Sequence, residues 1–191
     1  MNQEKKIKDL QEKIEQLTKM VEESQKPKSN ESLYESISSD RMIVLMNMMD
    51  AGGTYSVDGV PPIRFDEFGS MQRVKFEDLN ALISKYRETF KQIGIRIVNA
   101  DDVVDVLYLR TYYDKYDITK EELENLISLG TDEMIKKIKS LSNYLKESAF
   151  SIMISGVAEG NAKYMDRNKW KAIKDNFGVD IEKYSSKYPK E

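Results

Sequence analysis

The first pattern in the chain is a regular spacing of apolar residues within a charged N-terminal segment. Between residues 3 and 24 most other positions are Glu, Lys, Gln or Asp. The apolar positions alternate at intervals of three and four residues: Ile7, Leu10, Ile14, Leu17 and Val21. This is the a and d spacing of a heptad repeat, and so narrow a seam favours self-association over packing on a globular surface. Residues 1–24 are therefore predicted to form a coiled-coil oligomerisation helix.

The residues of the seam do not determine the number of helices in the coil. Ile at a with Leu at d favours two parallel strands, but the flanking positions Lys6, Gln11, Lys13, Thr18 and Met20 carry no strong charge code. Both a dimer and a trimer fit this pattern. The plainer alternative is an amphipathic helix that lies on the chain's own domain.

Residues 25–32 separate this segment from the rest of the chain. They contain Pro27 and small polar residues but no apolar side chain, so they are predicted to be a linker. After the linker we expect a small α+β domain at residues 33–117 and a helical bundle at residues 118–191.

Short apolar runs separated by turn residues occupy the stretch from 42 to 98. They lie at residues 42–49, 54–57, 60–65, 71–76 and 95–98. Asp58-Gly59 is a good hairpin turn because Gly adopts a positive φ without steric cost. Pro61-Pro62 cannot donate to a ladder, so the strand that contains it should lie at an edge. These runs predict one small antiparallel sheet.

The strand at residues 42–49 is apolar on both of its sides. Alternation along a strand divides its side chains into two sets, Met42, Val44, Met46 and Met48 in one and Ile43, Leu45 and Met49 in the other. Both faces are therefore expected to be covered, either by the chain's own fold or by a neighbouring subunit.

A single helix is predicted at about residues 77–94. Its apolar face is formed by Leu79, Leu82, Ile83, Tyr86 and Phe90. We expect this face to pack across the sheet, against strand residues such as Val44 and Val74. A second helix follows at residues 101–113.

From Thr119 onward the pattern is helical. Thr119 and Glu122 have the spacing of a capping box, and Gly156 is expected to weaken the end of a later helix. Asp166 and Gly178 have the positions of an N-cap and a C-cap for the last helix. The fold class is thus α+β, with a coiled coil at one end and a helical bundle at the other.

The amino-acid composition excludes several kinds of functional site. The 191 residues include no Cys and no His, which excludes disulfides, thiolate nucleophiles and the commonest general base at neutral pH. The net charge of −3 gives no general attraction to nucleic acid. The longest apolar run is far shorter than the ~20 residues of a membrane-spanning helix, and no signal peptide or membrane partner is expected.

The remaining candidates for chemistry are pairs of adjacent carboxylates. These are Asp66-Glu67, Asp101-Asp102 and Glu121-Glu122. Adjacent side chains diverge on a strand or helix, and acids in a first helical turn are stabilised by the helix dipole. Nucleotide-binding glycine motifs are also absent. We therefore expect no catalytic residue, no metal and no cofactor.

A basic segment lies between residues 163 and 190. Lys169, Lys171 and Lys174 could form a basic patch that contacts phosphate. Alternatively, Trp170 and Ile173 point into a bundle at helical spacing and the lysines are solvated. We favour the second interpretation.

Four short motifs in order resemble small accessory structural proteins of tailed bacteriophages. They are residues 44–48, the pair Gly52-Gly53, residues 64–69 and residues 74–79, and the resemblance extends over about residues 42 to 110. It implies a virion component that is capsid-attached, neck or fibre-like and has no enzymatic activity. It transfers no binding residues.

The expected function is therefore that of an oligomeric structural or assembly protein. It would act through contacts with itself and with other structural proteins, in the virion or in the host cytoplasm during assembly. Nucleic acid is not expected as a partner. The alternative is a nucleic-acid-binding or regulatory protein that uses the basic C-terminal helix.

Overall fold

The computed structural model describes residues 30–187. Contacts divide the chain into two units between Ser36 and Ile37. In the first unit the structure describes helix α2 (Asn30–Ser36), where the Ser36 hydroxyl donates to the carbonyl of Leu33 at 2.6 Å. The predicted coiled coil lies outside the described residues, whereas the last residues of the predicted linker belong to α2.

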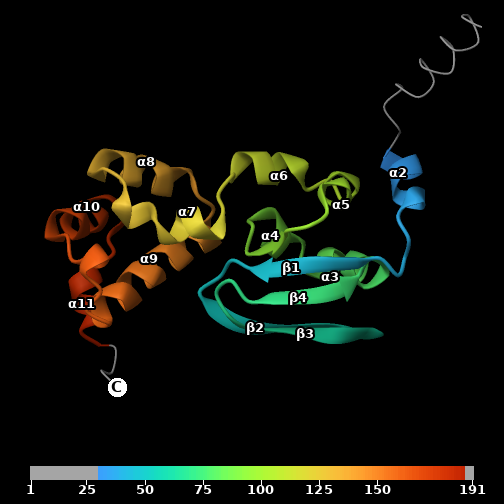
Figure 1. Cartoon of the computed structure of the whole chain (residues 1–191), viewed down its shortest axis with the longest axis horizontal. Helices are drawn as coiled ribbons and strands as arrows, with labels where there is room; N and C mark the ends of the chain where they lie inside the picture. The colour runs from blue at the N-terminus through green and yellow to red at the C-terminus, as the bar shows by residue number, and fades with distance from the viewer. Residues whose placement is uncertain (1–29, 188–191) are drawn as a thin grey trace, which may run out of the picture. The chain divides into compact units, whose positions relative to one another are not determined.

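The second unit is a mixed α+β fold, as predicted, and it contains two antiparallel sheets (Figure 1). The larger sheet has the order β4 (Met71–Lys75), β1 (Met42–Asn47), β5 (Ile95–Ile97). The smaller sheet is the hairpin of β2 (Ala51–Val57) and β3 (Val60–Glu67). The turn between β2 and β3 is the predicted Asp58-Gly59, and Gly59 has a φ of 77°.

The prediction of one sheet was wrong, because no backbone ladder joins β3 to β4. Within the described part of the chain, β3 pairs only with β2, as expected for an edge strand that contains two prolines. The link across the gap is a side chain: Nε2 of Gln72 donates to the carbonyl of Arg64 at 2.9 Å.

A buried asparagine joins the ends of these strands. The Asn47 side chain is fully buried, and its Nδ2 lies 2.9, 3.2 and 3.0 Å from the carbonyl oxygens of Met49, Ala51 and Glu67. Its Oδ1 accepts from the backbone N–H of Met49 at 3.2 Å. One side chain therefore fixes the end of β1, the start of β2 and the end of β3.

The helix α3 (Phe76–Lys85) packs on the sheets with the predicted apolar residues Leu79, Leu82 and Ile83, all of which are buried. Its contact with β1 differs from the prediction. Val74 pairs with Ile43, whereas Val44 pairs with Arg73. Cross-strand partners share a face, so Val44 lies on the side of the sheet opposite to Val74.

The predicted long helix is interrupted at Tyr86. This residue has a φ of −111° and a ψ of 34°, and it separates α3 from α4 (Arg87–Lys91). The Tyr86 hydroxyl donates to the carbonyl of Ser56 at 3.0 Å and accepts from its N–H at 3.2 Å. Its ring also meets that of Tyr55 edge to face at 5.0 Å.

The predicted helix at residues 101–113 is likewise two helices. They are α5 (Asp101–Val106) and α6 (Arg110–Lys115), and Tyr108 between them has a φ of 56°. In α6, Tyr113 is buried and its hydroxyl accepts from the N–H of Ile97 at 2.7 Å. Burial raises the pKa of Tyr113 to about 12, so this hydroxyl is protonated at neutral pH.

Short helices continue to the end of the described chain. They are α7 (Lys120–Glu124), η1 (Leu126–Ser128), α8 (Thr131–Ser140), α9 (Asn143–Ala158), η2 (Ala162–Tyr164), α10 (Arg167–Phe177) and α11 (Ile181–Ser185). The capping box of Thr119 and Glu122 is present, Asp166 caps α10, and Gly178 ends it with a φ of 74°. No helix among residues 30–187 is long and apolar enough to cross a membrane.

The helix α9 runs through Gly156 and ends two residues later, at Ala158. A residue without a side chain is needed at position 156 because the ring of Tyr164 occupies the space where a Cβ would lie. A Cβ at this position would lie 2.2 Å from Cδ2 of Tyr164, which is buried in η2.

Two serines join α9 to the sheet part of this unit. The Ser148 hydroxyl donates to the carbonyl of Met48 at 2.8 Å, and the hydroxyl of Ser142 donates to the carbonyl of Gln92 at 2.5 Å. Both serine side chains are buried. The helical part and the sheets therefore share hydrogen bonds within one compact unit.

Candidate protein-binding groove

The two faces of the larger sheet differ in how well they are covered. Ile43, Leu45 and Val74 point to one face and are buried against the rest of the unit. On the opposite face, Met42 and Met71 keep 48% and 54% of their surface exposed. Met46 on this second face is buried and Val44 is half-buried, so the expected cover of β1 is complete on one side and partial on the other.

The register of the strands groups the residues of the open side. Met42 pairs with Lys75, Val44 with Arg73 and Met46 with Met71. We call the face that carries these side chains the outer sheet face. It is apolar at its centre, and Val98, next to Val44 across the sheet, is also exposed at 38%. An exposed apolar face rimmed by charges is typical of a protein contact.

A groove borders this face where β3 and β4 separate. It has a volume of about 260 Å³. Its lining comes from β3 and β4, together with Met42 of β1 and Asp78 of α3: Met42, Val60, Pro61, Pro62, Ile63, Gln72, Arg73, Val74, Lys75 and Asp78. The Gln72 side chain, whose amide donates to the carbonyl of Arg64, is part of this lining. The walls are mostly aliphatic, which suits an apolar side chain.

The cations around the groove differ in how they are paired. Lys75 lies 2.7 Å from Asp40 and 3.6 Å from Glu77, and this pairing raises the pKa of Lys75 and lowers that of Asp40. Arg64 lies 3.0 Å from Asp66. The exposed guanidinium of Arg73, in contrast, has no hydrogen-bond or ion-pair partner among residues 30–187. Of these three cations, Arg73 is therefore the one that could pair with a carboxylate of a binding partner.

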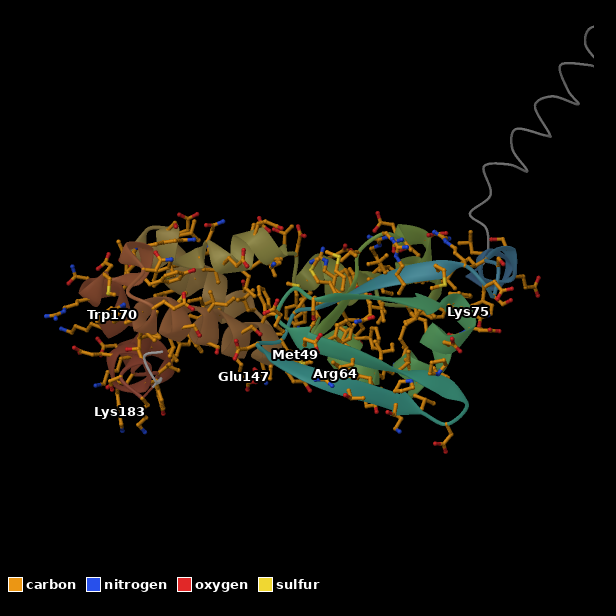
Figure 2. The ribbon with its side chains drawn as sticks, turned by 60° about the horizontal axis from the view of Figure 1, so that its bottom comes forward. Met49, Arg64, Lys75, Glu147, Trp170 and Lys183 are labelled. Carbon is orange, nitrogen blue, oxygen red and sulfur yellow. The ribbon has the colours of Figure 1, made fainter. Side chains whose placement is uncertain are left out.

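Figure 2 shows where this region lies in the unit. Lys75 is at one end of the larger sheet, Met49 is towards the other end, and Arg64 lies between them on the β2–β3 hairpin. Trp170 and Lys183 are in the helical part, away from the groove.

Two further hollows are polar, and each contains a lysine that has a partner within the fold. One, of about 350 Å³, contains Lys91, whose Nζ lies 3.0 Å from Glu88. The other, of about 340 Å³, contains Lys163, whose Nζ lies 2.6 Å from Oδ1 of Asn125. Within the described chain, no cluster of three or more His, Cys, Asp or Glu residues could hold a metal ion.

The paired carboxylates of the sequence have structural partners. Asp102 forms an ion pair with Arg41, which lowers the pKa of Asp102 and raises that of Arg41. Asp66 pairs with Arg64. Glu122 accepts from the N–H of Thr119 in the capping box, and this hydrogen bond lowers the pKa of Glu122. At least one carboxylate of each adjacent pair therefore has a partner within the fold.

Two of the three lysines of the predicted basic patch have partners within the fold. Nζ of Lys169 donates to the carbonyl of Ile127 at 2.6 Å. Lys174 pairs with Asp180 at 2.6 Å, which raises the pKa of Lys174 and lowers that of Asp180. Lys171 is exposed. Trp170 is half-buried, and its Nε1 donates to the carbonyl of Tyr164 at 2.6 Å.

Comparisons with known proteins give no relative for this chain. No family model, no curated protein and no solved structure matches it.

Sequence reasoning did not find the groove or Arg73. The groove exists because β3 and β4, which follow one another along the chain, do not pair. Hydrophobic periodicity predicts strands but does not predict which strands pair. The signals that could have indicated it are Pro61-Pro62 and the polar residues Gln72 and Arg73 in the facing strand.

Proposed function

We propose that this chain is a non-enzymatic structural or assembly protein that acts through protein–protein contacts. The observation that carries the proposal is the outer sheet face, where Met42 and Met71 stay exposed although the other side of the same sheet is buried. Methionine side chains adapt their shape readily and are common at binding surfaces. The adjoining groove adds a place for a side chain of a partner.

Self-association through the N-terminal heptad is the second part of the proposal. The seam of Ile7, Leu10, Ile14, Leu17 and Val21 supports a dimeric or trimeric coil. Oligomerisation would present two or three copies of the outer sheet face on one particle. Paired sites on one oligomer bind a multivalent surface far more tightly than one site alone.

The resemblance to phage accessory proteins supports a place in a virion. A protein of this kind would join to a capsid, neck or fibre and would be made in the host cytoplasm. Its presence as a stoichiometric component of purified particles, rather than only in the infected-cell lysate, is the observation that would establish this.

A nucleic-acid-binding function has less support. Lys169 and Lys174 are held by protein oxygens, so their charges are partly used within the fold. Salt-sensitive binding that weakens when Lys171 is neutralised would favour this alternative.

The self-association of the coil is tested by charging its seam. In the variant Ile14→Glu with Leu17→Lys, each copy would have to bury charges against its neighbours, which costs several kcal/mol per ion. We expect light scattering to give a mass near the 22.2 kDa of one chain for this variant and a multiple of it for the wild type.

The matched control places the same kinds of charge outside the seam. Glu12→Lys with Gln16→Glu should keep the wild-type mass, because neither position faces the neighbouring helix. Unfolding monitored by tryptophan fluorescence should be the same for all three proteins. A wild type that is monomeric at high concentration would exclude the self-associating coil.

A further inference from the structure

We infer that the groove between β3 and β4 binds an extended segment of another protein, with an apolar side chain in the groove and a carboxylate on Arg73. This inference rests on the proposed function, because it specifies the partner of the outer sheet face. Three features of the groove define that partner.

The first feature is the open edge of β4. Among residues 30–187 this strand pairs with β1 alone, so alternate backbone N–H and C=O groups point away from β1. On the opposite wall, Pro61 and Pro62 have no N–H to offer. Beyond the Gln72–Arg64 hydrogen bond, where β3 and β4 line the groove, the backbone of a bound segment could therefore hydrogen-bond to β4.

The second feature is the size and lining of the groove. Its volume of about 260 Å³ is below the ~300–1,000 Å³ typical of pockets for drug-sized ligands. Its walls include Met42, Val60, Ile63 and Val74. It therefore suits one or two aliphatic side chains and not a complete small molecule. In an extended peptide, side chains two positions apart point the same way and could reach it together.

The third feature is the charge of the rim. Lys75 and Arg64 already have carboxylate partners within the chain, whereas Arg73 has none among the described residues. A guanidinium binds a carboxylate through two parallel hydrogen bonds. Asp78 at the side of the groove would repel a second acid there. The partner segment is thus apolar with an acidic residue placed beside its anchoring side chain.

Methyl NMR of the full chain can test this inference, because two of the groove's neighbours are exposed methionines. The protein is labelled with ¹³C-methyl methionine, and the signals of Met42 and Met71 are assigned with Met→Leu variants. The probe is the peptide acetyl-Thr-Val-Asp-Leu-Thr-Val-Thr-amide, which alternates apolar and polar residues. The matched peptide has Lys in place of Asp.

We expect the signals of Met42 and Met71 to shift saturably with the Asp peptide, while those of the buried Met48 and Met134 stay in place. The affinity should fall about tenfold or more with the Lys peptide and with Arg73→Gln, which both remove a charge-assisted hydrogen bond. The control Arg87→Gln changes an exposed arginine on α4, outside the groove, and should bind as the wild type does.

Two results would overturn the inference. One is the absence of any shift at Met42 and Met71 with either peptide; the other is equal binding of both peptides by wild type and Arg73→Gln. If instead these signals shift with protein concentration alone and Met71→Lys lowers the mass, the groove's occupant is a second copy, and the inferred partner is wrong.

The light-scattering experiment separates this inference from the proposed function. An oligomer that binds neither peptide leaves the assembly role in place and removes only the inferred segment. A monomer that binds the Asp peptide selectively supports the groove and removes the self-associating coil.

Discussion

Replacing Asn47 by alanine is expected to destabilise the protein by about 3–5 kcal/mol, a large share of the ~5–15 kcal/mol that holds a typical domain together. The side chain is fully buried and bonds to the backbone of Met49, Ala51 and Glu67. Alanine removes all three of these hydrogen bonds from a buried site, although the carbonyl of Glu67 still accepts from the N–H and the hydroxyl of Ser70. Urea unfolding, followed by tryptophan fluorescence and circular dichroism, measures the change.

The matched control is Asn99→Ala. Asn99 also bonds to the backbone of β1, because its Oδ1 accepts from the N–H of Val44 at 2.9 Å. It is exposed, however, and water can replace that single bond, so the expected cost is about 1 kcal/mol or less. Equal costs for the two variants would show that burial of the Asn47 network contributes nothing beyond one hydrogen bond.

The second large effect is expected at Gly156. In the variant Gly156→Ala the new methyl group would lie 2.2 Å from the ring of Tyr164. That ring cannot move freely, since the Tyr164 hydroxyl donates to the carbonyl of Glu124 at 3.2 Å and its own carbonyl accepts from Trp170. We expect a loss of about 2–3 kcal/mol in thermal or urea unfolding, despite the ~1 kcal/mol by which Ala favours a helix.

A double-mutant cycle isolates the steric cause. In the background Tyr164→Ala, which removes the ring, Gly156→Ala should cost less than about 0.5 kcal/mol. Gly53→Ala is the control for the substitution itself, because its nearest neighbour is an ordinary 3.5 Å away. An unchanged cost in the Tyr164→Ala background would mean that the ring is not what excludes a side chain.

Features that depend on a few neighbouring residues could be predicted from the sequence. The hairpin turn at Asp58-Gly59 requires a positive φ that Gly supplies, and the capping box needs only Thr119 and Glu122 at the correct spacing. The apolar face of Leu79, Leu82 and Ile83 follows from helical periodicity. In each case the interaction that decides the structure lies within one turn of chain.

Features that depend on distant partners could not be predicted. The break at Tyr86 is fixed by hydrogen bonds to Ser56, and nothing in residues 77–94 indicates that contact. The assignment of Val44 to the helix side failed because register, rather than alternation alone, decides that Ile43 lies opposite Val74. The groove escaped prediction for the same reason, since it depends on two strands that remain unpaired.

The hydrogen bond from Ser148 to Met48 has a consequence for how the chain is made. The two residues are 100 positions apart, so at ~5–20 residues per second the ribosome adds Ser148 roughly 5–20 s after Met48. Throughout that interval the carbonyl of Met48, just after β1, lacks the hydroxyl that bonds to it in the native state, where Met48 is fully buried. During this time the nascent chain contains the apolar segment around Met48 without its native hydrogen-bond partner. The speed of translation determines how long other nascent chains can contact that segment.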